Sequence, residues 1–249
     1  MQAYLTLTRR ELGSFFLSWI GYVVIAGAMF LMGLSFVALL KQLQMEPTPM
    51  PLTQIFMEGC FWFIVLFSAP VITMRLFALE KYSGTFETLM TTPVSDWQVV
   101  LAKFTAAILF YMLMWLPLLG CVLALRYFAR GSNVLDPGTL GGTFLGIFFT
   151  GCLYMAAGCF ASALTRSQIV AAMISFAIGL AFFLAGYMAG PMDLQQTWAG
   201  QALNCVSVLG QMKDYARGVV DTRSICFCLT SSLFFLFLAC RVLESRRWR

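Results

Sequence analysis

The chain has 249 residues, of which 60% are hydrophobic and only 11% are charged. Soluble domains carry about a quarter charged residues, so a water-soluble fold of this length could not hide so much apolar surface. The solvent of this chain is therefore largely lipid. The net charge of +5 does not indicate a nucleic-acid partner, because the basic residues cluster at the ends of apolar runs, as they do in membrane proteins.

The first residues, 1–15, form a mildly amphipathic pattern. Leu5, Leu12 and Phe15 fall on one helical face, and the charged residues Arg9–Glu11 are expected to stay in water. This pattern predicts a helix lying on the cytoplasmic surface ahead of the first membrane span. The alternative is a short frayed tail.

Six apolar runs are long enough to cross the hydrocarbon, which takes about 20 helical residues. The runs are residues 16–40, 55–74, 104–125, 139–164, 169–189 and 225–242. Helices are expected because each backbone polar group is then satisfied within its own segment, and the alternation of barrel strands is missing. The predicted fold is an all-α integral membrane protein with one transmembrane domain over residues 1–249.

The distribution of Lys and Arg predicts that both termini are cytoplasmic. In that orientation ten basic residues lie in inner segments and six in outer segments. The C-terminal cluster of residues 246–249 is the strongest single anchor.

A few residues within the runs are candidates for special roles. Glu58 lies near the outer end of the second run, and an intramembrane carboxylate is a candidate polar site, although it can also simply reach the interface. Gly142 and Gly146 form a GxxxG pattern typical of close helix packing, either within one subunit or across a dimer. Pro70 and Pro117 are expected to bend their helices, as static kinks or as hinges.

The connection 75–103 is polar and too long for a tight turn. Ser83 or Thr85 can cap a short helix that Pro93 ends. Residues 86–90 carry both apolar and hydroxyl side chains, which suits a helix that presses into a groove on a partner. A solvated helix without a partner is the alternative.

The outer connection, residues 190–224, contains apolar residues at helical spacing. They predict a helix that lies on, or dips into, the outer leaflet. These residues are Leu203, Val206, Leu209, Met212, Tyr215 and Val219.

No catalytic or metal-binding residue is indicated. The chain has no histidine, and most of its 8 cysteines lie in apolar runs, where they behave as small hydrophobes. No G-x-x-x-x-G-K-[ST] loop occurs, so the chain is not expected to bind or hydrolyse ATP itself.

Three stretches resemble type-2 ABC transporter permeases, most closely those of the gliding-motility type and of nitrous-oxide reductase maturation. MRLFALEKYSGTFETLMTTPVSDWQVVLAKF, from Met74, is similar to the family's coupling-helix segment. RRELGSFFLSWIGYVVIAGAMFLMGLSF, from Arg9, resembles its interfacial helix and first span. DYARGVVDTRSICFCLTSSLFFLFLACRVLESRRWR, from Asp214, resembles its last outer turn, sixth span and basic C-terminus. One departure is Leu79, where relatives often carry a second acidic residue.

The resemblance implies six spans, an N-terminal interfacial helix, a cytoplasmic coupling helix between the second and third spans, and short outer helices between the fifth and sixth. Arg75 and Glu80 would hold the base of the coupling helix. The contact with an ATPase would be made by Glu80, Ser83, Gly84, Thr85, Phe86, Glu87, Thr88 and Leu89.

The resemblance also implies partners and a location. The expected partners are an ABC ATPase subunit that binds ATP and Mg, a second permease subunit (identical or related), and membrane lipid, and the family also allows a periplasmic accessory protein. The expected location is the bacterial inner membrane, and the family favours export.

Two other function classes compete with an exporter. A non-transporting membrane module that transmits force or a signal would also suit spans with few polar residues. A secondary transporter is disfavoured, because that class buries paired charges near the midplane and these span centres are nearly free of charge. The sequence leaves the cargo open.

Overall fold

The computed structural model describes residues 2–45, 60–84, 95–128, 137–188 and 206–247, and all regular structure within these ranges is helical. The helices are α1 (Gln2–Phe16), α2 (Trp19–Met45), α4 (Phe61–Thr73), α5 (Ala78–Ser83), α7 (Asp96–Phe128), α8 (Pro137–Leu164), α9 (Gln168–Met188), α11 (Val208–Ala216) and α12 (Thr222–Arg247). The all-α class expected from composition is confirmed.

Six of the described helical segments are long and apolar enough to cross a membrane. They are Trp19–Lys41, Phe61–Ser83, Asp96–Ala124, Pro137–Leu164, Gln168–Met188 and Thr222–Ser245, one for each apolar run of the sequence. Helix α7 begins eight residues before its apolar run, because residues 97–103 contain no glycine or proline that would stop it. The chain is therefore a multi-pass membrane protein.

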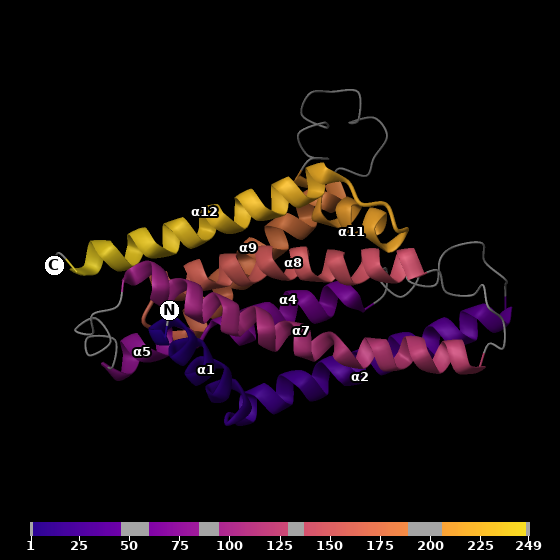
Figure 1. The fold of residues 1–249 in the computed structure, drawn as a ribbon, viewed down its shortest axis with the longest axis horizontal. Coiled ribbons are helices and arrows are strands. Elements are labelled where there is room, and N and C mark those ends of the chain that lie inside the picture. The colour runs from indigo at the N-terminus through magenta and orange to yellow at the C-terminus, as the bar shows by residue number, and fades with distance from the viewer. Residues whose placement is uncertain (1, 46–59, 85–94, 129–136, 189–205, 248–249) are drawn as a thin grey trace.

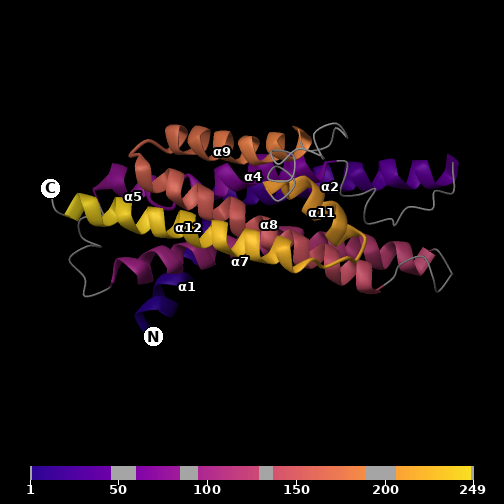
Figure 2. The same ribbon diagram turned by 90° about the horizontal axis from the view of Figure 1, so that it is seen from above.

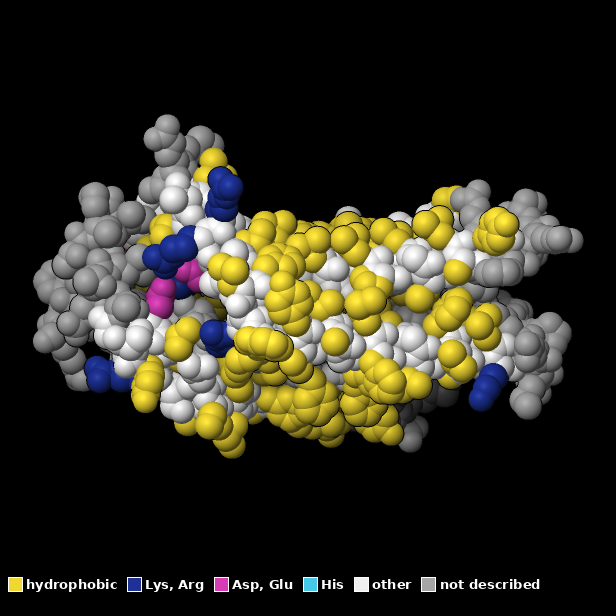
Figure 3. Space-filling model, turned by 90° about the horizontal axis from the view of Figure 1, so that it is seen from below, with side chains coloured by type: hydrophobic (Ala, Val, Ile, Leu, Met, Phe, Trp, Pro, Cys, Tyr) yellow, Lys and Arg dark blue, Asp and Glu magenta, His cyan; other side chains and the backbone are white. Residues whose placement is uncertain are grey.

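The long helices run side by side along the long axis of the molecule (Figures 1 and 2). Both termini, α1 and α5 lie toward one end, which we call the α5 end, and α11 lies toward the other. On the face shown in Figure 3, hydrophobic side chains cover the middle of the molecule, and acidic and most basic side chains gather toward the α5 end. This banding is what a lipid belt between two aqueous interfaces requires.

Helix α1 packs along the first turns of α7. The rings of Phe15 and Phe110 stack with centroids 4.9 Å apart, and the Tyr4 hydroxyl donates to Thr105 Oγ1 at 3.1 Å. Our expectation that Glu11 stays in water was wrong: its side chain is turned toward α7 and is buried.

Helix α8 lies at the centre of the bundle and has the largest buried share of the six spans. It contacts α4, α7, α9, α11 and α12. Small residues allow these neighbours to approach closely. A Cβ at Gly151 would lie 2.3 Å from the Tyr111 ring, and one at Gly158 would lie 2.1 Å from Thr73 Oγ1.

Helix α11 packs on α8 and α9 through an apolar face. Its N-terminus is capped by Ser207, whose Oγ accepts from the Gly210 N–H at 3.0 Å. Val208, Met212 and Tyr215 are buried. The buried apolar face of α11 therefore packs on the protein's own spans, and a position of this helix in the outer leaflet stays a prediction.

The GxxxG pattern of α8 lies under α11 in the same chain. A Cβ at Gly142 would be 2.5 Å from the Tyr215 carbonyl oxygen, and a Cβ at Gly146 would be 2.8 Å from Met212 Sδ. The two glycines thus serve contact within one subunit, the first of the two alternatives that the sequence left open.

Replacing Gly142 with alanine should destabilise the protein by about 1–3 kcal/mol, because the new methyl meets a backbone carbonyl that cannot turn aside. The neighbouring Gly141→Ala is the matched control: nothing lies within 4 Å of its Cβ, so the change should be neutral or stabilising by up to about 1 kcal/mol. SDS titration in mixed micelles measures both free energies of unfolding. Equal losses would show that α11 does not pack this closely.

Candidate functional site

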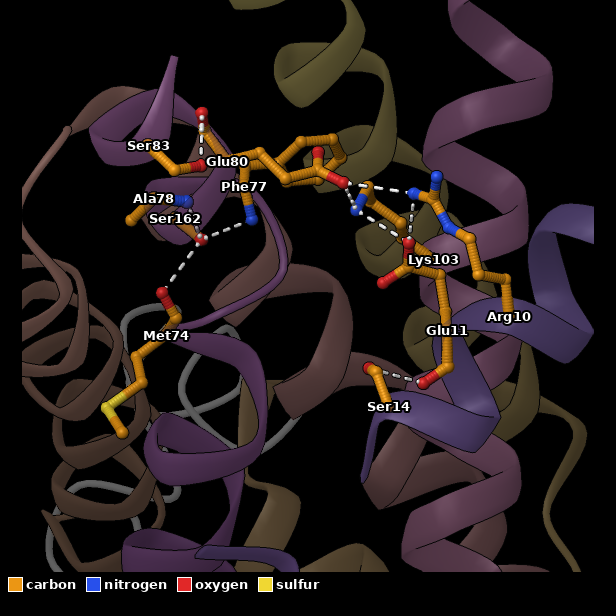
Figure 4. Close-up of polar contacts among 10 residues, drawn as sticks. All are labelled: Arg10, Glu11, Ser14, Met74, Phe77, Ala78, Glu80, Ser83, Lys103 and Ser162. Carbon is orange, nitrogen blue, oxygen red and sulfur yellow. Dashed lines mark hydrogen bonds and ion pairs between the residues drawn. The ribbon is translucent and has the colours of Figure 1, made fainter. Parts of the chain in front are cut away.

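The site begins at the bend between α4 and α5. Its centre is Ser162 of α8, whose Oγ accepts from the N–H groups of Phe77 at 3.0 Å and Ala78 at 3.1 Å and donates to the Met74 carbonyl at 3.2 Å (Figure 4). The first N–H groups of a helix have no partner within it, and Phe77 offers no side-chain cap. A distant helix therefore supplies the cap that the local sequence lacks.

The other end of α5 is closed by Gly84. Its φ of 76° is in the left-handed region, which glycine adopts without steric cost and which commonly ends helices. The Ser83 hydroxyl, at the last residue of α5, donates to the Glu80 carbonyl at 3.3 Å. The structure thus fixes a short helix directly ahead of residue 85.

Four charged residues from three helices meet beside α5, and we call them the charge cluster. Arg10 and Glu11 come from α1, Glu80 from α5 and Lys103 from α7 (Figure 4). Lys103 Nζ lies 2.9 Å from Glu80 Oε1 and 3.2 Å from Glu11 Oε1. A nitrogen of the Arg10 guanidinium lies 2.8 Å from Glu11 Oε1 and 3.2 Å from Glu80 Oε1. Each cation therefore bridges both carboxylates.

Three members of the charge cluster are shielded from water, and Arg10 forms its exposed edge. The side chain of Lys103 is only 3% exposed, and those of Glu11 and Glu80 are 11% and 17% exposed. A buried ammonium is tolerated when opposite charges surround it, and here two carboxylates balance two cations. The hydrogen bond to Glu11 raises the pKa of Arg10 above its usual value, so this side chain stays charged. The Phe77 ring, 5.4 Å from Lys103 Nζ, adds a cation–π contact.

Helix α5 is also tied to the far side. Lys81 Nζ donates to the Ala163 carbonyl near the C-terminal end of α8, where an unpaired carbonyl favours a cation. Glu80 and Lys81 are adjacent in sequence, yet one binds α1 and α7 and the other binds α8. Helix α5 is thus bonded to three helices, α1, α7 and α8, and also contacts α9.

The structure describes only some of the residues that the sequence predicts for the site. Glu80, Ser83 and Gly84 lie in or at the end of α5, whereas residues 85–89 and Glu58 lie outside the described residues. Arg75 donates to the Ser18 hydroxyl, in the turn between α1 and α2.

Sequence reasoning missed the partners that hold α5. These are Arg10, Glu11, Lys103 and Ser162. One signal was available: Lys103 is an isolated charge beside a long apolar run, and such a charge calls for a buried partner. The identity of that partner depends on tertiary packing.

The sequence model of ABC-2 family transporter proteins matches residues 34–209, which is more than half of the chain. The chain belongs to the ABC-2 transporter family. This ABC-2 permease is therefore a membrane component of an ATP-binding-cassette transporter and associates with an ABC ATPase subunit. The match includes α5, Lys103 and Ser162, and leaves out α1 and α12. No curated protein gave a significant match to the chain.

Proposed function

We propose that this ABC-2 permease is the membrane subunit of an exporter in a bacterial inner membrane. An ABC ATPase that binds ATP and Mg drives it through a coupling element formed by residues 80–89. The observation that supports this most directly is the bonding of α5 to three helices, immediately before the residues that resemble the family's coupling contact.

The α5 end is the cytoplasmic end in this proposal. Helices α1 and α5, which carry three residues of the charge cluster, and both termini are at that end (Figure 1). Basic residues accumulate on the cytoplasmic side of membrane proteins, and α1 then lies at the inner interface. Glu58 stays a predicted polar site near the outer surface.

The mechanism is mechanical. When ATP draws two ATPase subunits together, each displaces residues 80–89 of its permease. Because α5 is bonded to α1, α7 and α8, the displacement reaches the spans as a shift of packed helices rather than the bending of a loop. The ATPase can drive this change only as far as its nucleotide-bound form binds the two permease states with different affinity. A second permease subunit, identical or related, completes the path for the cargo.

Inverted membrane vesicles provide the test, because an exporter fills them from outside. Vesicles carrying the permease and its ATPase are incubated with a cell extract, Mg and ATP, and their contents are compared by mass spectrometry. The control vesicles carry an ATPase whose catalytic glutamate is replaced. At least one compound should accumulate only with the active ATPase.

Two results would contradict this function. ATP hydrolysis by the purified permease alone would show that the permease is itself an ATPase, which contradicts a separate ATPase subunit. ATP-dependent motion of the permease without accumulation of any compound would favour the force-transmitting module. A C-terminal epitope tag, exposed in inverted vesicles and protected in right-side-out vesicles, checks the orientation.

A further inference from the structure

We infer that α8 transmits the displacement of α5 to α11 at the opposite end of the molecule, and that Ser162 is the positioning residue of this route. The inference rests on the proposed function and adds a path through the fourth span, which is not the span attached to the coupling element on either side.

At the α5 end, two residues of α8 that lie one turn apart contact the bend after α4. Gly158 meets the Thr73 side chain with no room for a methyl group, and Ser162 bonds the backbone on both sides of the bend. One residue further, the Ala163 carbonyl accepts from Lys81. Each of these contacts joins the backbone on one side to a side chain on the other, so the loss of a single side chain can weaken the joint.

At the other end, α8 contacts α11 closely, again through two residues. Gly142 and Gly146 are also one turn apart, and both meet atoms of α11 at distances that exclude a methyl group. The outermost residues of the two joints, Gly142 and Ser162, lie about 20 residues apart along one helix, or roughly 30 Å. The helix between them is buried on nearly all sides, so it translates or rotates as a rod rather than bending.

Ser162 is the part of the route that a single substitution can loosen. Alanine at this position removes the acceptor for two buried N–H groups and the donor to the Met74 carbonyl, and keeps the bulk of the side chain almost unchanged. Helix α5 would remain tied to α1 and α7 by the charge cluster. Displacement of α5 would then reach α7 but pass weakly to α8.

Hydrogen–deuterium exchange of the permease–ATPase complex in lipid nanodiscs tests this route without labels. The measured quantity is the change in deuterium uptake caused by ATP with vanadate, in peptides covering α5 and peptides covering α11. The native complex should respond in both. Ser162→Ala should keep the response of α5 and lose at least half of the response of α11. Ser162→Cys, with a weaker acceptor of similar size, should fall between.

Ser232→Ala is the matched control, because Ser232 is also buried in a span but its hydroxyl donates to the Cys228 carbonyl of its own helix. It should leave both responses intact. An unchanged response of α11 in Ser162→Ala would overturn the inference and leave the proposed function standing, with α9, which also contacts both elements, as the remaining route. Absence of any response of α5 in the native complex would instead overturn the proposed function.

If Ser162→Ala fails to assemble, Lys81→Met decides. Lys81 is partly exposed, and its loss removes the other bond between α5 and α8. A reduced response of α11 in this variant supports the route through α8, and a native response overturns it.

Discussion

Replacing Lys103 with methionine should lower both the stability of the permease and its stimulation of the ATPase. Glu11 and Glu80 would then repel each other with only Arg10 between them. Removing one member of a buried ion pair costs about 3–5 kcal/mol, and the slight exposure of the carboxylates argues for the lower end. A tenfold loss of ATPase stimulation needs only about 1.4 kcal/mol. SDS titration and ATP hydrolysis in nanodiscs measure the two effects.

Three controls separate the charge cluster from a general effect. Lys103→Arg keeps the charge and should retain most of the activity. Glu80→Gln combined with Lys103→Met should be less damaging than the sum of the two changes, because the repulsion is removed together with the cation. Arg241→Met breaks an exposed ion pair with Glu244, which is worth at most about 1 kcal/mol. Additive losses in the double variant would show that the cluster does not act as a unit.

The substitutions Glu87→Arg and Leu89→Arg should each weaken the docking of the ATPase about thirtyfold or more. Both residues lie in the stretch that resembles the family's coupling contact. A charge of the wrong sign, or one placed in an apolar contact, typically costs an interface about 2 kcal/mol or more, close to a thirtyfold loss of affinity. Binding of the ATPase subunit to nanodisc-embedded permease measures this loss directly.

Glu244→Arg is the matched charge reversal. Glu244 belongs to the cytoplasmic end in our proposal, and within the described residues its ion pair is with Arg241, one turn away on the same helix. Its reversal should leave the affinity for the ATPase within about twofold, since surface ion pairs contribute little. Native affinity and native ATPase stimulation in Glu87→Arg and Leu89→Arg would rule out the docking role of residues 80–89.

The sequence predicts the spans well because the hydrocarbon thickness acts on each segment separately. A run of apolar residues such as 139–164 becomes α8 whatever its neighbours are. The contacts between spans follow a different rule. The bond from Ser162 to Phe77 joins residues 85 positions apart, and periodicity within one helix carries no information about it.

The glycines of α8 show the same limit of what can be predicted from the sequence. The spacing of Gly142 and Gly146 predicts a face for close packing, yet their partner α11 is set by the return of the chain after α9. Likewise, amphipathic spacing in residues 1–15 predicts α1 but misplaces Glu11, because the position of Lys103 on α7 decides which side of α1 becomes buried. Local patterns predict the elements, and the pairing of elements decides which polar residues form the site.

The N-terminal cap of α5 comes from α8, so this cap forms late in the synthesis and insertion of the chain. The ribosome releases residues 77 and 78 more than eighty residues before Ser162, so the second span is made well ahead of the helix that caps α5. Until the fourth span is inserted, the amide groups of Phe77 and Ala78 have only water or lipid headgroups as partners. A nascent permease therefore completes the cap of α5 only after its fourth span is in place.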